Sequence, residues 1–394
     1  MYLIKLLIRI GLDLFFFPFL LLGSLVARFC HRKIQIGIGP EPIISHLHLK
    51  KALIHSGFSV ETFVNQVYYI TSEFDYRGDK IFNNKQINYV LLPYILFLRS
   101  IFRYQLQYFY FRGGSLGDTI LLWRAEPYLL WLAKVKVVLT AYGADIQNMY
   151  HTGNLIFRST ISKTYPKNNF NKNRIQAKID LWTTSGSYIL AGCDWVEYLF
   201  HWDRLCLGPF VFDFDIINRP EFLPKAKITK SFRIVAAPNH GEIKGIPFLK
   251  KAITELNQEG FDIDLLLVEK KSNIEVLEAI ASADLIFDQI IIGFYAFFAI
   301  EAMALGKPVM CHIKPALEEL YIHEGLIEPD ELPFIRVDFL SLKERIAFYY
   351  INREALEKIG VKSKKFVHKF HSAQYISNLF EEIFKKHGIF PLMN

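Results

Sequence analysis

The sequence from Ser282 to Ile313, SADLIFDQIIIGFYAFFAIEAMALGKPVMCHI, alternates between strand-like and helix-like patterns. Its short apolar run Leu285 to Phe287 predicts a buried strand, with Asp288 and Gln289 at the carboxyl end. Gly293 follows in a loop. Polar groups at the end of a parallel strand lie where open α/β sheets bind ligands, so this strand end is a candidate binding site.

The second half of this stretch predicts a helix and another strand. Tyr295 to Leu305 has one charged residue, Glu301, and Gly306 suits the left-handed position that ends a helix. Pro308 cannot continue a helix, so Pro308 to Ile313 predicts the next buried strand. One carboxylate on an apolar helix beside two strand ends indicates a ligand contact. A carboxylate that caps a backbone or pairs with a lysine is the alternative.

The run from Glu301 to Val309, EAMALGKPV, together with Ala283-Asp284, resembles the donor-site segment of retaining glycosyltransferases with the GT-B fold, of the group 1, family 4 type. The resemblance implies that Glu301 binds the ribose hydroxyls of a nucleotide. That family usually has two glutamates eight residues apart, and here the first position is Gly293. This departure concerns contacts to the donor sugar.

Composition restricts the class of protein. The 394 residues allow two α/β domains, and a hydrophobic content of 52% excludes disorder. The net charge of +7 indicates an anionic partner, either a phosphate-bearing substrate or a membrane surface. No nucleic-acid-binding motif occurs, so nucleic acid is not an expected partner. The four cysteines are far apart and predict free thiols, with neither a disulfide framework nor a zinc site.

Residues 1–33 differ from the rest of the chain. Leu14 to Ala27 is uncharged and apolar, but it is short for a membrane span. Extending it back to Leu3 includes three charged residues. The segment predicts an interfacial helix or a marginal signal anchor, and a buried N-terminal helix is the alternative. The cations between Arg28 and Lys33 place the downstream chain in the cytoplasm by the positive-inside rule.

The first domain is predicted to open with a Rossmann-like unit. Ile34 to Ile38 is a strand leading into Gly39, Ser45 to Ser56 is a helix, and Ser59 to Val64 is the next strand. The Gly37-Ile-Gly39 turn alone is a weak ligand signal.

An aromatic stretch predicts a further helix and strand. Tyr89 to Arg103 is predicted as the helix, and Gln105 to Phe111 as the strand, which runs into a turn that contains Gly114. Interleaved aromatic and basic residues could contact lipid or bases, but core packing is favoured.

The next strand, Val137 to Thr140, is followed by Tyr142-Gly-Ala-Asp145. The family has a related segment, often with a histidine where Tyr142 stands, and the resemblance associates that histidine with the donor sugar. We expect Gly114, Tyr142 and Asp145 on the acceptor side.

The stretch from His151 to Ile179 has six lysines and arginines and no acidic residue. Four asparagines make its middle loop-like. Either a solvated loop or a basic loop at the acceptor or membrane side fits this pattern. We expect Ile179 to Thr184 to return to the sheet, and we place the linker between domains near Asn218 to Ser231.

The second domain is predicted to begin with the strand Phe232 to Ala237. His240 and Lys244-Gly245 match a family segment whose cations hold the donor diphosphate, and Gly241 stands where the family has an arginine. A helix begins near Pro247, and its N-terminus beside Lys244 favours an anion. The site residues expected from spacing and resemblance are Lys244 and Glu301 as catalytic residues, with Gly39, His240, Gly245, Asp288 and Gly293 as further donor contacts.

These features together predict an α/β chain with two Rossmann-like doubly wound domains in the GT-B arrangement, which faces a central cleft. The predicted boundaries are 1–33 for a membrane-associating segment, 34–217 for an acceptor domain, 218–372 for a nucleotide-sugar domain, and 373–394 for a final helix on the first domain.

The resemblance implies a hexosyltransferase-type enzyme that moves a sugar from a nucleotide-sugar donor to a glycan or lipid-linked acceptor, with retention and without metal or other cofactor. The expected place is the cytoplasmic face of the cell membrane, in envelope polysaccharide or glycolipid assembly. A GT-B-like nucleotide-sugar epimerase and a non-catalytic membrane-bound partner of another transferase are the alternatives.

Overall fold

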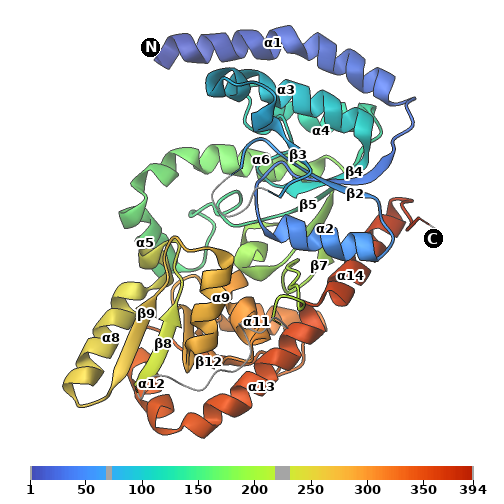
Figure 1. Cartoon of the computed structure of the whole chain (residues 1–394). Coiled ribbons are helices and arrows are strands. Elements are labelled where there is room, and N and C mark those ends of the chain that lie inside the picture. The colour runs from blue at the N-terminus through green and yellow to red at the C-terminus, as the bar shows by residue number, and fades with distance from the viewer. Residues whose placement is uncertain (1, 68–72, 218–230, 393–394) are drawn as a thin grey trace. The chain divides into compact units, whose positions relative to one another are not determined.

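The computed structural model describes residues 2–67, 73–217 and 231–392. The chain forms two compact units (Figure 1). The first comprises Met1–His151, Phe170–Cys206 and Ser377–Asn394, and the second comprises Thr152–Asn169 and Leu207–Ile376. Residues 152–169 thus cluster with the second unit, although the sequence analysis assigns them to the first domain. The predicted linker, apart from Ser231, lies outside the described residues.

The first unit is built on a seven-stranded parallel sheet in the order β3-β2-β1-β4-β5-β6-β7. Its strands are β1 Ile34–Ile38, β2 Val60–Val64, β3 Tyr76–Arg77, β4 Tyr104–Tyr110, β5 Lys136–Thr140, β6 Tyr188–Ala191 and β7 Arg204–Leu205. The order reverses between β1 and β4, which makes that pair the switch point of a doubly wound sheet.

Helices cover both faces of this sheet because successive strand residues point to opposite sides. On β4, Tyr108 contacts Phe380 of α14, and its neighbour Phe109 contacts Trp182 of α6, with ring centroids 5.2 and 5.1 Å apart. The helical segments are α1 Tyr2–Ala27, α2 Ser45–His55, α3 Lys85–Arg103, α4 Glu126–Leu132, α6 Lys172–Thr184 and α14 Ala373–Lys386, with short 3₁₀ turns η1 Gly78–Lys80, η2 Leu122–Arg124 and η4 Cys193–Tyr198.

Two sequence predictions in this region are wrong. The segment expected as a basic loop is helical, forming α5 Leu155–Thr164, the 3₁₀ turn η3 Pro166–Asn171 and α6. The predicted strand Ile179 to Thr184 is the end of α6. Ile179 and Trp182 are both buried three residues apart, which is the spacing of one helix face.

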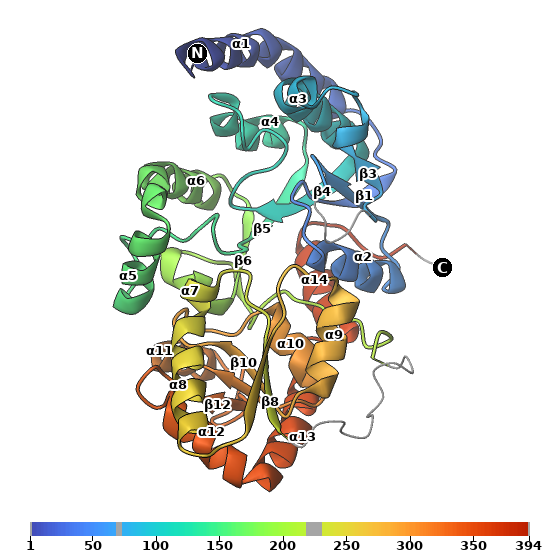
Figure 2. The ribbon, with the colours of Figure 1, turned by 60° about the vertical axis from the view of Figure 1, so that its left-hand side comes forward.

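The second unit is built on a five-stranded parallel sheet in the order β12-β11-β10-β8-β9, and helices flank it on both sides (Figure 2). The strands are β8 Phe232–Ala236, β9 Ile263–Leu267, β10 Leu285–Gln289, β11 Val309–Cys311 and β12 Phe334–Arg336. Its helices, besides α5, are α7 Gly241–Lys244, α8 Ile246–Gln258, α9 Asn273–Ser282, α10 Phe297–Ala304, α11 Pro315–His323, α12 Leu342–Ile351 and α13 Arg353–Phe370. The predicted α/β class with two parallel, doubly wound sheets is confirmed.

The apolar N-terminal segment is the helix α1, which lies along α3 and α4 of its own unit (Figures 1 and 2). It has 26 residues and contains Pro18. Among the described residues it is the one helix whose length and composition fit a bilayer span. Only 22% of its apolar window is buried, so α1 is not the buried core helix considered as an alternative.

Candidate functional site

The buried amide of Gln289 fixes the loop that joins β10 to α10. Its Nε2 donates to the carbonyls of Phe294 and His312 at 2.9 and 2.8 Å. Its Oε1 accepts from the backbone N–H of Ile292 at 2.8 Å. Donors and acceptors of one side chain therefore hold the loop in a single conformation at the carboxyl end of the sheet.

Lys244 and Asp288 form the charged centre beside this loop. Lys244 Nζ lies 2.7 Å from Asp288 Oδ1, and the other carboxylate oxygen accepts from the N–H of Ala296 at 3.0 Å. Asp288 is fully buried, while 15% of the Lys244 side chain stays exposed. The buried carboxylate thus holds a partly accessible ammonium group at the edge of the sheet.

Gly245 brings the start of α8 against the same loop. Its φ of +86° is left-handed, and a Cβ atom there would lie 2.4 Å from Cγ1 of Ile290. Only glycine fits this approach. Gly245 is also the N-cap of α8, so no side chain caps that helix start. The positive end of the helix dipole therefore lies next to Lys244.

Gly293, which stands where the family has its first glutamate, is covered by Lys314. A Cβ atom on Gly293 would lie 2.3 Å from Cε of Lys314, and φ is +101°. The Lys314 N–H donates to the Gly293 carbonyl at 2.9 Å. The lysine stem therefore occupies the space that a side chain at Gly293 would need.

Glu301 lies on α10 and is 5% exposed. Asn273, the first residue of α9, donates its amide to Glu301 Oε1. Burial raises the pKa of Glu301 to about 8, and the hydrogen bond from Asn273 only partly offsets this. Glu301 is therefore mostly protonated at neutral pH and can still bond a further polar group.

His240 and the segment 152–169 meet at the other side of α7. The His240 Nδ1 and the Tyr165 hydroxyl are hydrogen-bonded at 2.6 Å. Asn154 donates to the carbonyls of Ile291 and Ile292 at 2.6 and 3.0 Å. The start and end of α5 are thereby attached to the loops that carry Lys244 and Gly293.

The expected donor contact Gly39 and the expected acceptor-side residues Gly114, Tyr142 and Asp145 lie at the carboxyl ends of β1, β4 and β5. Gly39 follows β1, where a Cβ atom would lie 1.9 Å from the carbonyl oxygen of Phe63. Gly114 follows β4 and donates to Glu126 at 3.1 Å. Glu126 also accepts from Leu116 at 2.8 Å, and burial raises its pKa to about 7. Gly39 thus packs closely on the backbone of Phe63, and Gly114 on the carboxylate of Glu126.

Asp145 has its carboxylate occupied by backbone groups. It accepts from the N–H groups of Phe111, Tyr142 and Gly143, each at 3.0 Å. Burial still raises its pKa to about 7. Tyr142 packs its ring edge-to-face on Tyr110 at 5.1 Å. Asp145 therefore organises the loops after β4 and β5.

A charged cluster that the sequence analysis missed lies at the same edge. Arg112 forms two bonds to Asp118, at 2.6 and 3.0 Å, and lies 3.4 Å from Glu41. Lys178 donates to the Gly117 carbonyl at 2.8 Å. The basic residue Lys178 therefore holds a loop of its own unit, and it does not face lipid. Arg112 follows β4 and Glu41 follows β1 in the sequence. Their positions just after two predicted strands could have indicated this cluster from the sequence.

No group of three or more His, Cys, Asp or Glu side chains among the described residues could hold a metal ion. The four cysteines are not disulfide-bonded; Cys193, Cys206 and Cys311 are buried and Cys30 is exposed.

Comparisons with solved structures place this arrangement in the GT-B fold. The chain is similar to Anabaena HepE in complex with UDP-glucose, with a TM-score of 0.59, 12% identity, and coverage of 89% of this chain and 99% of that one. It is similar to sucrose-phosphate synthase from Thermosynechococcus elongatus, with a TM-score of 0.55, 13% identity and coverage of 90% and 99%. It is also similar to WaaG, a glycosyltransferase involved in lipopolysaccharide biosynthesis, with a TM-score of 0.56, 10% identity and coverage of 88% and 99%.

The comparisons show the fold of this chain. These three neighbours are GT-B glycosyltransferases, and the similarity confirms the predicted fold class. No family model matches the chain, and no curated protein matches it.

Proposed function

We propose that this protein is a glycosyltransferase that moves a sugar from a nucleotide-diphosphate sugar to a glycan or lipid-linked acceptor. The observation that carries the proposal is the second unit's strand edge. There an accessible lysine, an uncapped helix start and a buried acid lie around one rigid loop. The neighbour HepE, solved with UDP-glucose, supports a nucleotide-sugar as the donor.

In the proposed reaction, this site stabilises the negative charge of the leaving group. As the glycosidic bond of the donor breaks, negative charge builds on the leaving diphosphate. Lys244 Nζ donates one hydrogen to Asp288 and has no further hydrogen-bond partner in the described parts of the chain, so its remaining hydrogens can bond phosphate oxygens. The start of α8 adds backbone dipoles, and Lys314 is the second cation that replaces the family's arginine at Gly241. Fixed charges of this kind stabilise the leaving group without reorganisation.

Glu301 is proposed to bind the ribose. Its carboxylate accepts from sugar hydroxyls when it is ionised, and Asn273 orients it. His240 and Tyr165 close the site on the side of α5. Retention of configuration, hexose as the transferred sugar, and turnover without metal are part of the proposal because the Glu301–Val309 segment resembles the retaining family.

We place the enzyme on the cytoplasmic face of a membrane, held by α1 without a span. One face of α1 is bound to its own unit through polar groups. Asp13 is buried and accepts from the Tyr94 hydroxyl at 2.6 Å and from the N–H groups of Ile120 and Leu121 at 2.9 and 2.6 Å. A helix that left the unit to cross a bilayer would carry this carboxylate, stripped of its partners, into hydrocarbon.

The opposite face of α1 is apolar and exposed. Leu14 and Leu22 are 62% and 61% exposed, and among the exposed positions from Leu3 to Ala27 only Lys5 is charged. Arg28 and Lys33 follow at the end of the helix, where anionic headgroups would lie. An apolar stripe flanked by cations suits a helix that lies in the interface. A lipid-linked acceptor in envelope glycan assembly would be reached from there.

The test of the function is transfer by purified protein. Nucleotide-sugars are incubated with the protein and a lipid extract, in excess EDTA, and nucleoside diphosphate and glycolipid are measured by mass spectrometry. We expect both products, and NMR of the purified glycolipid should show the anomeric configuration of the donor. A changed nucleotide-sugar without acceptor would indicate an epimerase, and no reaction with any donor would support a non-catalytic partner.

A further inference from the structure

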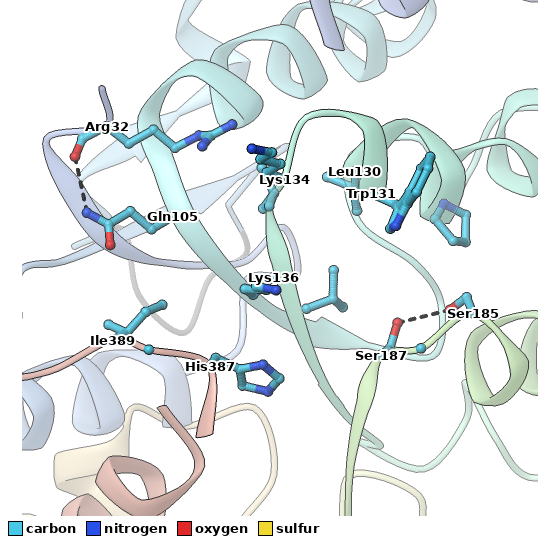
Figure 3. A pocket seen from close by; sticks show the side chains of 15 residues that line it. Arg32, Gln105, Leu130, Trp131, Lys134, Lys136, Ser185, Ser187, His387 and Ile389 are labelled. Carbon is cyan, nitrogen blue, oxygen red and sulfur yellow. Dashed lines mark hydrogen bonds between the residues drawn. The ribbon is translucent and has the colours of Figure 1, made fainter. Parts of the chain in front are cut away.

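A hollow of about 600 Å³ lies at the amino ends of β4, β5 and β6 in the first unit (Figure 3). It is the opposite end of the sheet from Gly39, Gly114 and Tyr142. The turn between α4 and β5, the turn between α6 and β6, and the chain after α14 form its walls. The proposed reaction does not use it.

The charge of this hollow is positive. Lys134, Lys136 and Arg32 line it, and no acidic residue does. Lys134 and Lys136 are exposed and form no ion pair with a described residue. His387 presents a buried Nε2 that has no hydrogen-bond partner in the described part of the chain. Asp203 acts on His387 electrostatically but does not line the hollow. These groups suit an anion with several acceptor oxygens.

The hollow adjoins the C-terminal end of α1. Arg32 follows that helix and donates to the carbonyls of Ala27, Ile101 and Ala133. It thereby ties the last residue of α1 to the wall of the hollow. Trp131 of α4 also lines the hollow and is 64% exposed, as is usual for tryptophan at a membrane interface. The cationic hollow thus lies beside the C-terminal end of α1.

From the cations of the hollow, its position beside the end of α1 and the exposed Trp131, we propose that the hollow binds the phosphate headgroup of an anionic membrane lipid while α1 lies in the interface. The inference rests on the membrane attachment proposed above. The acyl chains would lie toward α1 and Trp131, and the phosphate between Lys134 and Lys136.

The first experiment compares binding of the full chain to vesicles of phosphatidylcholine alone and with one-third phosphatidylglycerol. The variant is Lys134→Gly with Lys136→Gln. Lys134 has φ +57°, so glycine suits its backbone. The matched control removes two exposed lysines of α13, by Lys358→Gln and Lys362→Gln. At about fivefold per lysine, we expect the double variant to lose roughly 25-fold of its affinity for anionic vesicles.

The outcomes separate this inference from the attachment itself. Unchanged binding to neutral vesicles, with lost preference for anionic ones, supports the headgroup site. An equal loss in the control, or a preserved preference in the variant, overturns it. If the wild-type protein binds neither kind of vesicle, the proposed membrane attachment through α1 is overturned.

Two further measurements identify the source of the phosphate. Lipids brominated near the headgroup should quench wild-type fluorescence more than that of Trp131→Phe, and equal quenching overturns the proposal. Inorganic phosphate should not stabilise the free protein in a thermal melt. Stabilisation by millimolar phosphate that the lysine variant loses would identify a soluble anion as the ligand and overturn the lipid assignment.

Discussion

Buried carboxylates occupy the carboxyl edges of both sheets, but their partners differ. In the first unit, Glu126 and Asp145 are bonded to two and three backbone N–H groups given above. In the second unit, Glu301 is bonded to one side chain, Asn273. Burial raises the pKa of all three, to about 7 for the first two and about 8 for Glu301.

This difference separates carboxylates that build loops from one that is available to a ligand. An acid that satisfies several backbone donors has little capacity left, and its removal leaves those donors unpaired. An acid held by one flexible amide retains acceptor capacity in a water-poor position. We therefore expect variants in the first unit to change stability and variants in the second to change nucleotide binding.

The largest expected effect is on stability, from Asp145→Ala. This change leaves the N–H groups of Phe111, Tyr142 and Gly143 without their acceptor. At about 1–3 kcal/mol for each buried donor, the free energy of unfolding should fall by roughly 3 kcal/mol or more. Urea denaturation measures it, and Asp145→Asn, which keeps one oxygen, should lose less. A stable Asp145→Ala protein that no longer binds nucleotide would reverse the comparison.

The next effect is on binding, from Lys244→Met combined with Asp288→Asn. The pair is changed together because Asp288 would otherwise be buried without its cation. Loss of a charge-assisted contact costs about 1.5–3 kcal/mol, so nucleoside diphosphate affinity should fall about 10- to 150-fold. Lys250 is an exposed lysine on α8, and the variant Lys250→Met is the control in calorimetric titration. Equal affinity in the double variant and the control would remove Lys244 from the site.

Glu301 predicts a pH dependence of binding. Ribose hydroxyls donate to the ionised carboxylate, while the empty site has a pKa of about 8. Binding should therefore release a proton, and affinity should rise by up to tenfold per pH unit between pH 6 and 7. Titrations in buffers of different ionisation enthalpy count the proton. Glu301→Gln should abolish the part of the pH dependence that comes from Glu301. The part that comes from titration of the nucleotide phosphates should remain, because it is common to both proteins. A wild-type profile identical to that of Glu301→Gln would contradict the assignment.

The smallest expected effect comes from Lys314→Met. If Lys314 is the second cation, its loss should weaken diphosphate binding about fivefold, near 1 kcal/mol, and leave nucleoside binding unchanged. Lys314→Arg should restore most of the affinity. A matched loss for nucleoside and diphosphate would show that Lys314 only packs on Gly293.

Much of the fold could be predicted because buried parallel strands are short apolar runs. The strand Ile34–Ile38 has the predicted bounds, and the final helix begins at Ala373 as predicted. Ile179–Thr184 failed for the same reason, since a short apolar run does not distinguish a strand from a helix end. The second half of α6 is recognised as a helix only from the structure, in which its Trp182 contacts Phe109.

The candidate site could be predicted where the sequence around a residue marks it, and not where a residue reaches the site through its side chain alone. Asp288 is near the end of strand β10, Lys244 ends the short helix α7, and Glu301 is the one charged residue of α10. Asn273 and Tyr165 reach the site from separate helices, and their roles depend on side-chain directions that spacing does not give. A lysine directly before Pro315 at the end of β11 was a usable signal for Lys314.

The central claim is that the second unit binds a nucleoside diphosphate through Glu301 and Lys244. The most direct test is a thermal melt of wild type, Glu301→Ala and the Lys244→Met/Asp288→Asn variant with each common nucleoside diphosphate. Ligand that binds only the folded state at a hundred times its Kd stabilises by about 2.7 kcal/mol. We predict that one nucleotide raises the melting temperature of the wild type and that both variants lose most of the shift. A wild type that no nucleoside diphosphate stabilises, or variants that are stabilised equally, would contradict the claim.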